Sequence, residues 1–84
     1  MGFRVVYKAS VEKDLKKIDK AGAKKILNKI EKELAKDPDR GVALSGTSQG
    51  LYRYSIGDYR IVYTRTVDRI LVLRIGQRKD VYRA

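Results

Sequence analysis

The C-terminal half of the chain carries the side chains best suited to chemistry on a phosphate group. Eight arginines and one lysine lie between Arg40 and Arg83, together with only three acids. Ten lysines, five acids and no arginine lie between Lys8 and Lys36. The planar guanidinium of arginine binds phosphate through two hydrogen bonds, whereas lysine suits a solvated helix face. A functional site is therefore expected in the arginine-rich half.

Strand alternation predicts which of these side chains share a surface. In the predicted strand 59–66, Arg60 points away from the apolar residues at 61 and 63, and in the strand before it Arg53 and Ser55 share one side. The segment after the last predicted strand adds four polar residues: Arg78, Lys79, Tyr82 and Arg83. Cations and a phenol in one open groove provide phosphate recognition and stabilise the extra charge of a phosphorane-like transition state.

The N-terminal part of the chain predicts a strand followed by a first helix. Residues 3–8 are mainly β-branched and aromatic, which favours a strand. Ser10 is predicted to cap a helix whose apolar positions recur at i, i+4 and i+7 from Val11. Gly22 is predicted to end that helix in the left-handed conformation.

A second helix and a run of strands follow. Apolar residues form one stripe over residues 26–34, and Pro38 with its flanking aspartates is predicted to stop this helix. Residues 39–50 are predicted to form a loop, with Val42 and Leu44 turned toward the core. Gly57 and Asp58 suit a two-residue hairpin turn that places glycine first. Three strands are predicted after the loop: 51–56, 59–66 and 69–75.

The order βααβββ predicts one α+β domain over residues 1–84. It is a small sandwich, with a mainly antiparallel sheet and an N-terminal helical hairpin packed on one face. The strand at 69–75 is apolar on both faces, which predicts a central strand covered on both sides. The chain is short, so its stability is expected to be modest.

Composition excludes several classes of function. The chain has no cysteine and no histidine, which rules out disulfides, cysteine-based zinc sites, thiol nucleophiles and the usual general base. Its net charge of +10 favours a polyanionic partner, with nucleic acid first, an acidic protein second and an anionic membrane surface third. No apolar run approaches the length of a membrane span, and the opening residues lack a secretory signal, so the cytoplasm is the expected location.

The chain also resembles the RelE/ParE superfamily of toxins from type II toxin-antitoxin systems. The resemblance covers nearly the whole chain and rests on an ordered set of short segments. They are Leu-Ser-Gly at 44–46, Leu-Tyr-Arg at 51–53, Gly-Asp-Tyr-Arg-Ile-Val-Tyr at 57–63 and Ile-Gly-Gln-Arg-Lys-Asp-Val-Tyr at 75–82.

The resemblance implies a RelE-like, ribosome-dependent endoribonuclease that cuts messenger RNA in the decoding site and so inhibits translation. Cleavage in that family proceeds by 2′-hydroxyl attack on the adjacent phosphate, without a metal or other cofactor. By position, Arg60 and Arg78 would bind and neutralise the scissile phosphate. Tyr82 would act as general base or stacking platform, although a phenol is a poor base at neutral pH unless cations favour its anion.

The same resemblance implies a substrate-binding set of Arg53, Ser55, Lys79 and Arg83. Arg53 takes the place of the first of two lysines in the best-known nucleases, and Ser55 takes the place of the second. Lys79 and Arg83 would add general electrostatic attraction. Gln77 stands where many relatives carry histidine. These departures put the activity of the site in question, but they leave Arg60, Arg78 and Tyr82 in place.

Partners and alternative functions follow from the same resemblance and from the charge. The implied partners are the 30S decoding site with its ribosomal RNA, messenger RNA, and an acidic RelB-like antitoxin that wraps the toxin in a higher-order heteromer; no membrane partner is implied. One alternative is a ParE-like toxin that inhibits DNA gyrase by protein binding. Another is a non-catalytic basic module that binds RNA.

Overall fold

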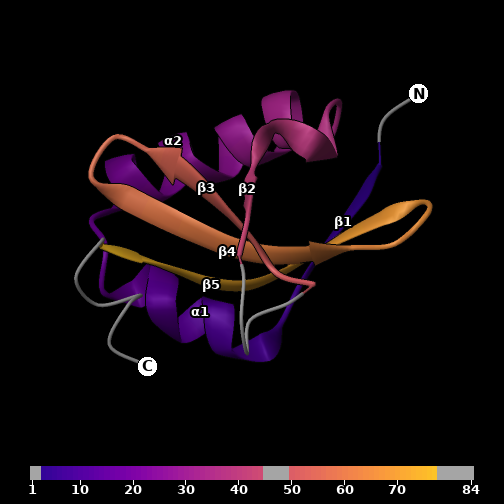
Figure 1. Cartoon of the computed structure of the whole chain (residues 1–84). Helices are drawn as coiled ribbons and strands as arrows, with labels where there is room; N and C mark the ends of the chain where they lie inside the picture. The colour runs from indigo at the N-terminus through magenta and orange to yellow at the C-terminus, as the bar shows by residue number, and fades with distance from the viewer. Residues whose placement is uncertain (1–2, 45–49, 78–84) are drawn as a thin grey trace.

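The computed structural model describes residues 3–44 and 50–77 and has the predicted α+β fold (Figure 1). Its elements in chain order are β1 (Arg4–Tyr7), α1 (Ala9–Lys16), α2 (Lys20–Lys29), a π-helical turn η1 (Ile30–Leu34), a 3₁₀ turn η2 (Pro38–Arg40), β2 (Val42–Ala43), β3 (Tyr52–Ile56), β4 (Tyr59–Arg65) and β5 (Arg69–Gln77). In the described part of the chain, no helix is long and apolar enough to cross a bilayer.

The strands form one five-stranded sheet in the order β1-β5-β4-β3-β2. Neighbouring strands run antiparallel except β1 and β5, which pair in parallel. A parallel pair needs a long connection, and here the connection from β1 to β5 contains both helices and the strands β2 to β4. The β3–β4 connection is the predicted two-residue turn, in which Gly57 has a φ of 59°. The mainly antiparallel sheet is therefore confirmed.

Both helices pack on one face of the sheet, as predicted. In Figure 1, α1 lies along β5 and α2 lies behind β3. The core joins apolar side chains of the helices and η1 to those of the three long strands: Val11, Ile26, Ile30, Leu34, Ile56, Ile61, Tyr63, Ile70, Val72 and Ile75. Burying one such aliphatic side chain contributes about 1.5 to 3 kcal/mol. This single core fixes the sheet, and the sheet's other face carries both polar side chains and apolar ones such as Val6, Val62 and Leu71.

Three local predictions are wrong. Lys8, not Ser10, is the N-cap of α1, and Ser10 lies inside the first turn. Gly22 lies within α2 instead of ending α1, because the side chain of Asp19 caps α2 and accepts the Gly22 N–H at 3.3 Å. Val42 does not turn toward the core. It is 57% exposed in β2, a two-residue strand at the sheet edge that sequence analysis did not predict.

The strand β5 is central, as predicted, but it is not covered equally on both faces. Ile70 and Val72 are fully buried, whereas Leu71 and Leu73 are only half-buried. The register shifts between β4 and β5 after Val72, so Leu73 is an extra residue in β5. This bulge changes which side chains of β5 face the core beyond it.

Candidate functional site

Arg60 lies near the start of β4, the middle strand of the sheet, with β3 on one side and β5 on the other. Its Cα pairs with Ser55 on β3 and with Gly76 on β5. Directly opposite residues of antiparallel strands point to the same face. Gly76 contributes no side chain on that flank of Arg60.

The structure brings three of the predicted site residues onto one face. Arg53 pairs with Val62, two residues from Arg60, and therefore lies on the same side of the sheet as Ser55 and Arg60. Ser55 is exposed, and both arginines are half-buried. We call the sheet face away from the helices the polar face. Its side chains Arg53, Ser55 and Arg60 share one face, as strand alternation predicts.

The guanidinium of Arg60 is folded over the β3–β4 hairpin. Its Nη1 donates to the carbonyl oxygens of Gly57 at 3.1 Å and Tyr59 at 3.0 Å. Within the described residues these carbonyls, and not the carboxylate of Asp58, are its hydrogen-bond partners. A guanidinium has five N–H donors, so contacts through Nη1 alone leave it the capacity to bind a phosphate.

The other predicted site residues lie outside the described residues. They are Arg78, Lys79, Tyr82 and Arg83. The last described strand ends at Gln77, whose Cα pairs with Tyr59, the neighbour of Arg60. The described part of β5 thus ends beside the Arg60 position, and the roles of the four later residues stay predictions.

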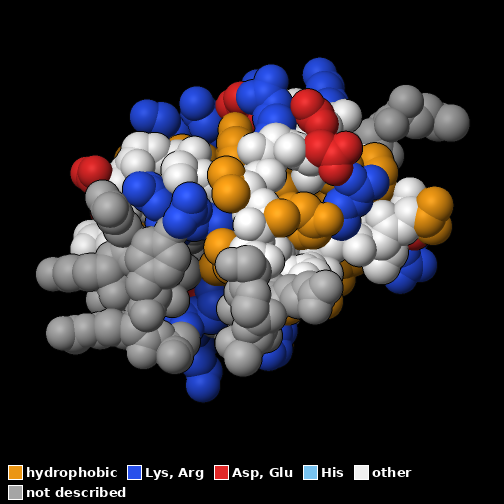
Figure 2. Space-filling model, in the orientation of Figure 1, with side chains coloured by type: hydrophobic (Ala, Val, Ile, Leu, Met, Phe, Trp, Pro, Cys, Tyr) orange, Lys and Arg blue, Asp and Glu red, His pale blue; other side chains and the backbone are white. Residues whose placement is uncertain are grey.

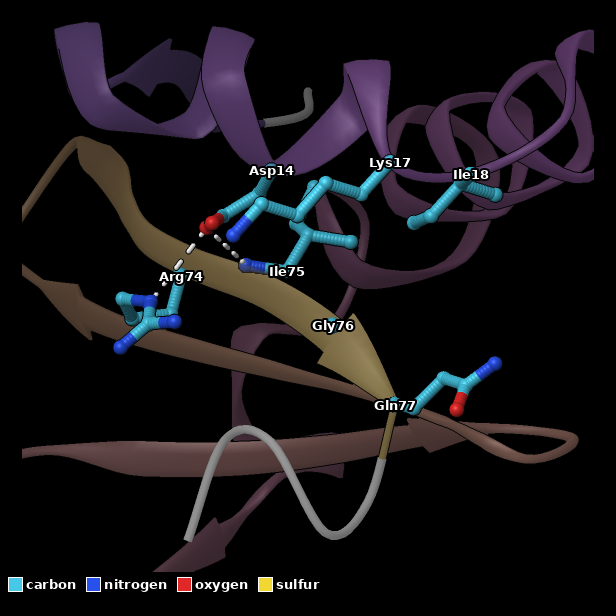
Figure 3. Close-up of a pocket in the computed structure, with 7 residues that line it drawn as sticks. All are labelled: Asp14, Lys17, Ile18, Arg74, Ile75, Gly76 and Gln77. Carbon is cyan, nitrogen blue, oxygen red and sulfur yellow. Dashed lines mark hydrogen bonds and ion pairs between the residues drawn. The ribbon is translucent and has the colours of Figure 1, made fainter. Parts of the chain in front are cut away.

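Sequence analysis missed Arg74, which also lies on the polar face. Its Cα pairs with Val62, and its side chain is 37% exposed. Arg74 Nε lies 3.4 Å from Oδ2 of Asp14, a buried acid on α1. Both residues line a cleft of about 360 Å³ between the end of α1 and the end of β5 (Figure 3). The sequence signal that could have indicated this contact is Asp14, which lies three residues after Val11 beside the apolar stripe of the first helix. An acid at such a position is rarely buried unless it is paired with a cation.

Several other arginines of the C-terminal half have structural partners. Arg40 Nη1 lies 2.9 Å from Glu33 Oε1, Arg65 forms an ion pair with Asp39, and Arg69 Nε lies 4.0 Å from Asp68 Oδ1. Figure 2 accordingly shows lysine and arginine side chains spread over the visible face instead of gathered at one point. The arginine-rich composition therefore reflects both a candidate site and surface ion pairs.

The described part of the polar face offers guanidinium and hydroxyl groups. Among the residues that the structure describes, no three His, Cys, Asp or Glu side chains come together as a set of metal ligands. Guanidinium groups bind a phosphodiester and stabilise the negative charge that develops on it during attack. This is the chemistry that the arrangement supports.

Comparison with known proteins agrees with the fold. A sequence model described as the ParE toxin of type II toxin-antitoxin system, parDE, matches residues 5–82. Among solved structures, the chain is similar to the RelE–RelB complex of the archaeon Pyrococcus horikoshii, with 30% identity over 93% of this chain and 97% of that chain and a TM-score of 0.67. No curated protein sequence matches the chain significantly.

Two more distant structures share the fold. The toxin-antitoxin complex RelBE2 of Mycobacterium tuberculosis aligns with a TM-score of 0.88 and 20% identity, over 93% of this chain and 100% of that chain. A mutant of the Escherichia coli toxin RelE in the free state aligns with a TM-score of 0.76 and 18% identity, over 99% of this chain and 93% of that chain.

Proposed function

Since the chain belongs to the ParE toxin family, within the RelE/ParE superfamily of type II toxin-antitoxin systems, we propose that it is an endoribonuclease toxin. Its substrate is messenger RNA held in the ribosomal A site, and cleavage there stops translation. The observation that carries the proposal is the polar face, where Arg60 stands beside Ser55, Arg53 and the side-chain-free Gly76.

The proposed reaction is an internal transesterification. The 2′-oxygen of a nucleotide forms a bond to the adjacent phosphorus, and the proton of the 2′-hydroxyl passes to a base. The bond from phosphorus to the 5′-oxygen breaks, which leaves a 2′,3′-cyclic phosphate, and the released 5′-oxygen takes up a proton from water. Arg60 and Arg78 neutralise the phosphate as negative charge builds up, and Tyr82 serves as base or stacks on a nucleobase. Arg53, Ser55, Lys79 and Arg83 hold the strand. The reaction needs no cofactor.

Primer extension on messenger RNA programmed into ribosomes tests this proposal. Purified protein should cut within A-site codons, and a ribosome-free reaction should show no such cuts. Arg60→Ala should lower the cleavage rate by about 100-fold or more, since removing one stabilising donor from a transition state costs about 10²- to 10³-fold.

A matched control removes the same charge elsewhere. Arg69→Ala changes an exposed arginine at the opposite end of β5, where its Cα pairs with Arg4. It should cleave at close to the unmutated rate, and both variants should unfold at similar denaturant concentrations. Equal cleavage by Arg60→Ala and the unmutated protein would sink the nuclease assignment.

The family match also favours a second candidate function. ParE-type toxins include non-enzymatic members, and this chain would then inhibit DNA gyrase by binding it. A supercoiling assay separates the two. Inhibition of gyrase together with absence of cleavage on ribosomes would select the protein-binding function, and Arg60→Ala would then leave inhibition unchanged.

An antitoxin is the proposed protein partner. The similar Pyrococcus horikoshii toxin is found in a complex with RelB. The net charge of +10 suits an acidic segment that wraps this chain, folds on binding and blocks the polar face. A co-purified complex that still cleaved RNA at the full rate would contradict this role.

A further inference from the structure

The strand β5 has a neighbouring strand on both edges for only part of its length. Parallel pairing with β1 runs from Arg69 to Val72, and the Lys8 N–H donates to the Val72 oxygen at 2.9 Å where that pairing ends. Pairing with β4 continues to Gln77 on the other edge. The backbone after Val72 therefore needs other partners on the edge that β1 leaves, because an unpaired buried N–H is costly.

Asp14 supplies that partner from α1. Its Oδ2 accepts the N–H of Ile75 at 3.1 Å and lies 3.4 Å from Arg74 Nε. Figure 3 shows the carboxylate reaching from the helix to the strand at this point. Asp14 is 9% exposed and is the buried charged residue of the described chain. Its carboxylate thus stands where the next strand of the sheet would otherwise supply a carbonyl.

The contact lies directly after the β5 bulge. If β5 were regular, with Leu73 opposite Val62, alternation from Val72 would turn Arg74 into the core. Because Leu73 is left out of the pairing, Ile75 is buried opposite Ile61, and Arg74 lies opposite Val62 on the polar face. The hydrogen bond from Ile75 and the contact with Arg74 both hold this shifted register in place.

We propose that Asp14 is a positioning residue for the polar face. By holding Ile75, it fixes the last residues of β5 against β4, so that Gly76 stays opposite Arg60. By contacting Nε, it directs the remaining N–H groups of Arg74 toward the polar face, where they bind RNA phosphate. This role rests on the proposed nuclease function and deepens it.

The two bonds of Asp14 can be separated by substitution. Asp14→Asn keeps an oxygen that accepts the Ile75 N–H but removes the negative charge beside Arg74. Asp14→Ala removes both. Glu12→Ala is the matched control, since Glu12 is an exposed acid on the same helix.

The first measurement is amide hydrogen exchange by NMR on the free protein, which does not depend on activity. In Asp14→Ala, the amide of Ile75 should exchange about 10- to 100-fold faster, as expected from loss of a hydrogen bond to a charged group. Asp14→Asn should retain most of the protection, and Glu12→Ala should retain all of it.

The second measurement is single-turnover cleavage on programmed ribosomes, at a temperature where every variant is folded. Asp14→Ala should lower the maximal rate by about 100-fold, because misplacing a catalytic group by about 1 Å costs that much. The half-saturating ribosome concentration should change little. Asp14→Asn should be intermediate. A merely structural role would lower the melting temperature of Asp14→Ala while its folded fraction cleaved at the normal maximal rate.

The outcomes distinguish this inference from the proposed function. If the unmutated protein does not cleave, the nuclease assignment fails, and exchange at Ile75 still decides whether Asp14 fixes the strand. Normal exchange at Ile75 in Asp14→Ala overturns the inference in either case. Fast exchange combined with a normal maximal rate of cleavage overturns the link between this strand end and catalysis.

Discussion

At the scale of single residues, the same side-chain type has different roles set by what lies beside it. Arg65 forms an ion pair with Asp39 and lies over the ring of Phe3, 5.3 Å from its centroid. Arg60 instead contacts two backbone carbonyls on the polar face. Ion pairs of exposed residues contribute little to stability, so Arg65 is a surface contact. Arg60, whose described contacts are backbone carbonyls, therefore keeps its charge available for RNA.

Tyr63 illustrates a polar group that is buried and fully used. Its hydroxyl donates to the Pro38 oxygen at 2.6 Å and accepts the Gly41 N–H at 3.1 Å, and its ring stacks on Tyr52. Tyr63→Phe should lower the free energy of unfolding by about 1 to 3 kcal/mol, because it leaves two backbone groups without their partner. Urea unfolding measures this, and a variant as stable as the unmutated protein would show that water replaces the hydroxyl.

At the scale of elements, the junction of β1 with the helices contains Tyr7, whose buried hydroxyl, unlike that of Tyr63, is not hydrogen-bonded within the described residues. Burial, and to a lesser degree the charge of Glu31, raises the pKa of Tyr7 to about 12. Tyr7→Phe should therefore leave stability at pH 7 unchanged or raise it by up to about 1 kcal/mol, in contrast to Tyr63→Phe.

The same junction predicts how stability changes in alkali. Tyrosine in the unfolded chain ionises near pH 10, whereas folded Tyr7 ionises near 12. Between these values the unfolded state binds fewer protons, so the free energy of unfolding falls as pH rises. Burial also raises the pKa of Tyr63, so Tyr7→Phe should remove only part of the fall. Urea midpoints on both sides of pH 10 measure it, and an identical fall in Tyr7→Phe would contradict the assignment.

Sequence pattern located the long elements because their apolar periodicity reflects one core. It missed β2, whose two residues are both exposed. It also misplaced the helix ends, because α1 begins without a side-chain cap and Asp19 caps α2 so that Gly22 lies inside that helix. Strand alternation placed Arg53, Ser55 and Arg60 on one face, which the structure confirms.

Strand alternation does not predict the face of Arg74, because the bulge at Leu73 shifts the alternation by one residue. The sequence pattern does not indicate this bulge. The contact of Asp14 with Ile75 was also beyond pattern analysis. It joins residues 61 positions apart, and only the packing of α1 on β5 brings them together. The residues that hold a site in place are thus harder to predict than those that form its surface.

At the scale of the whole molecule, the two kinds of cation belong to different sides of the fold. The lysines between Lys8 and Lys36 belong mostly to the helical layer, whereas the polar face carries Arg53, Arg60 and Arg74. A net charge of +10 attracts RNA to every part of the surface, so affinity alone does not locate the binding face. The salt dependence of single variants does locate it.

Each cation that contacts a phosphate releases counterions from the RNA. For a single strand, each such contact makes the slope of log association constant against log salt concentration more negative by about 0.7. Arg53→Gln and Arg60→Gln should each flatten that slope by about 0.7, measured by anisotropy of a labelled single-stranded RNA between about 50 and 200 mM salt. Lys24→Gln, an exposed change on α2, should lower affinity slightly without changing the slope. A slope flattened by Lys24→Gln and unchanged by both arginine variants would place the RNA on the helices and remove the polar face from the mechanism.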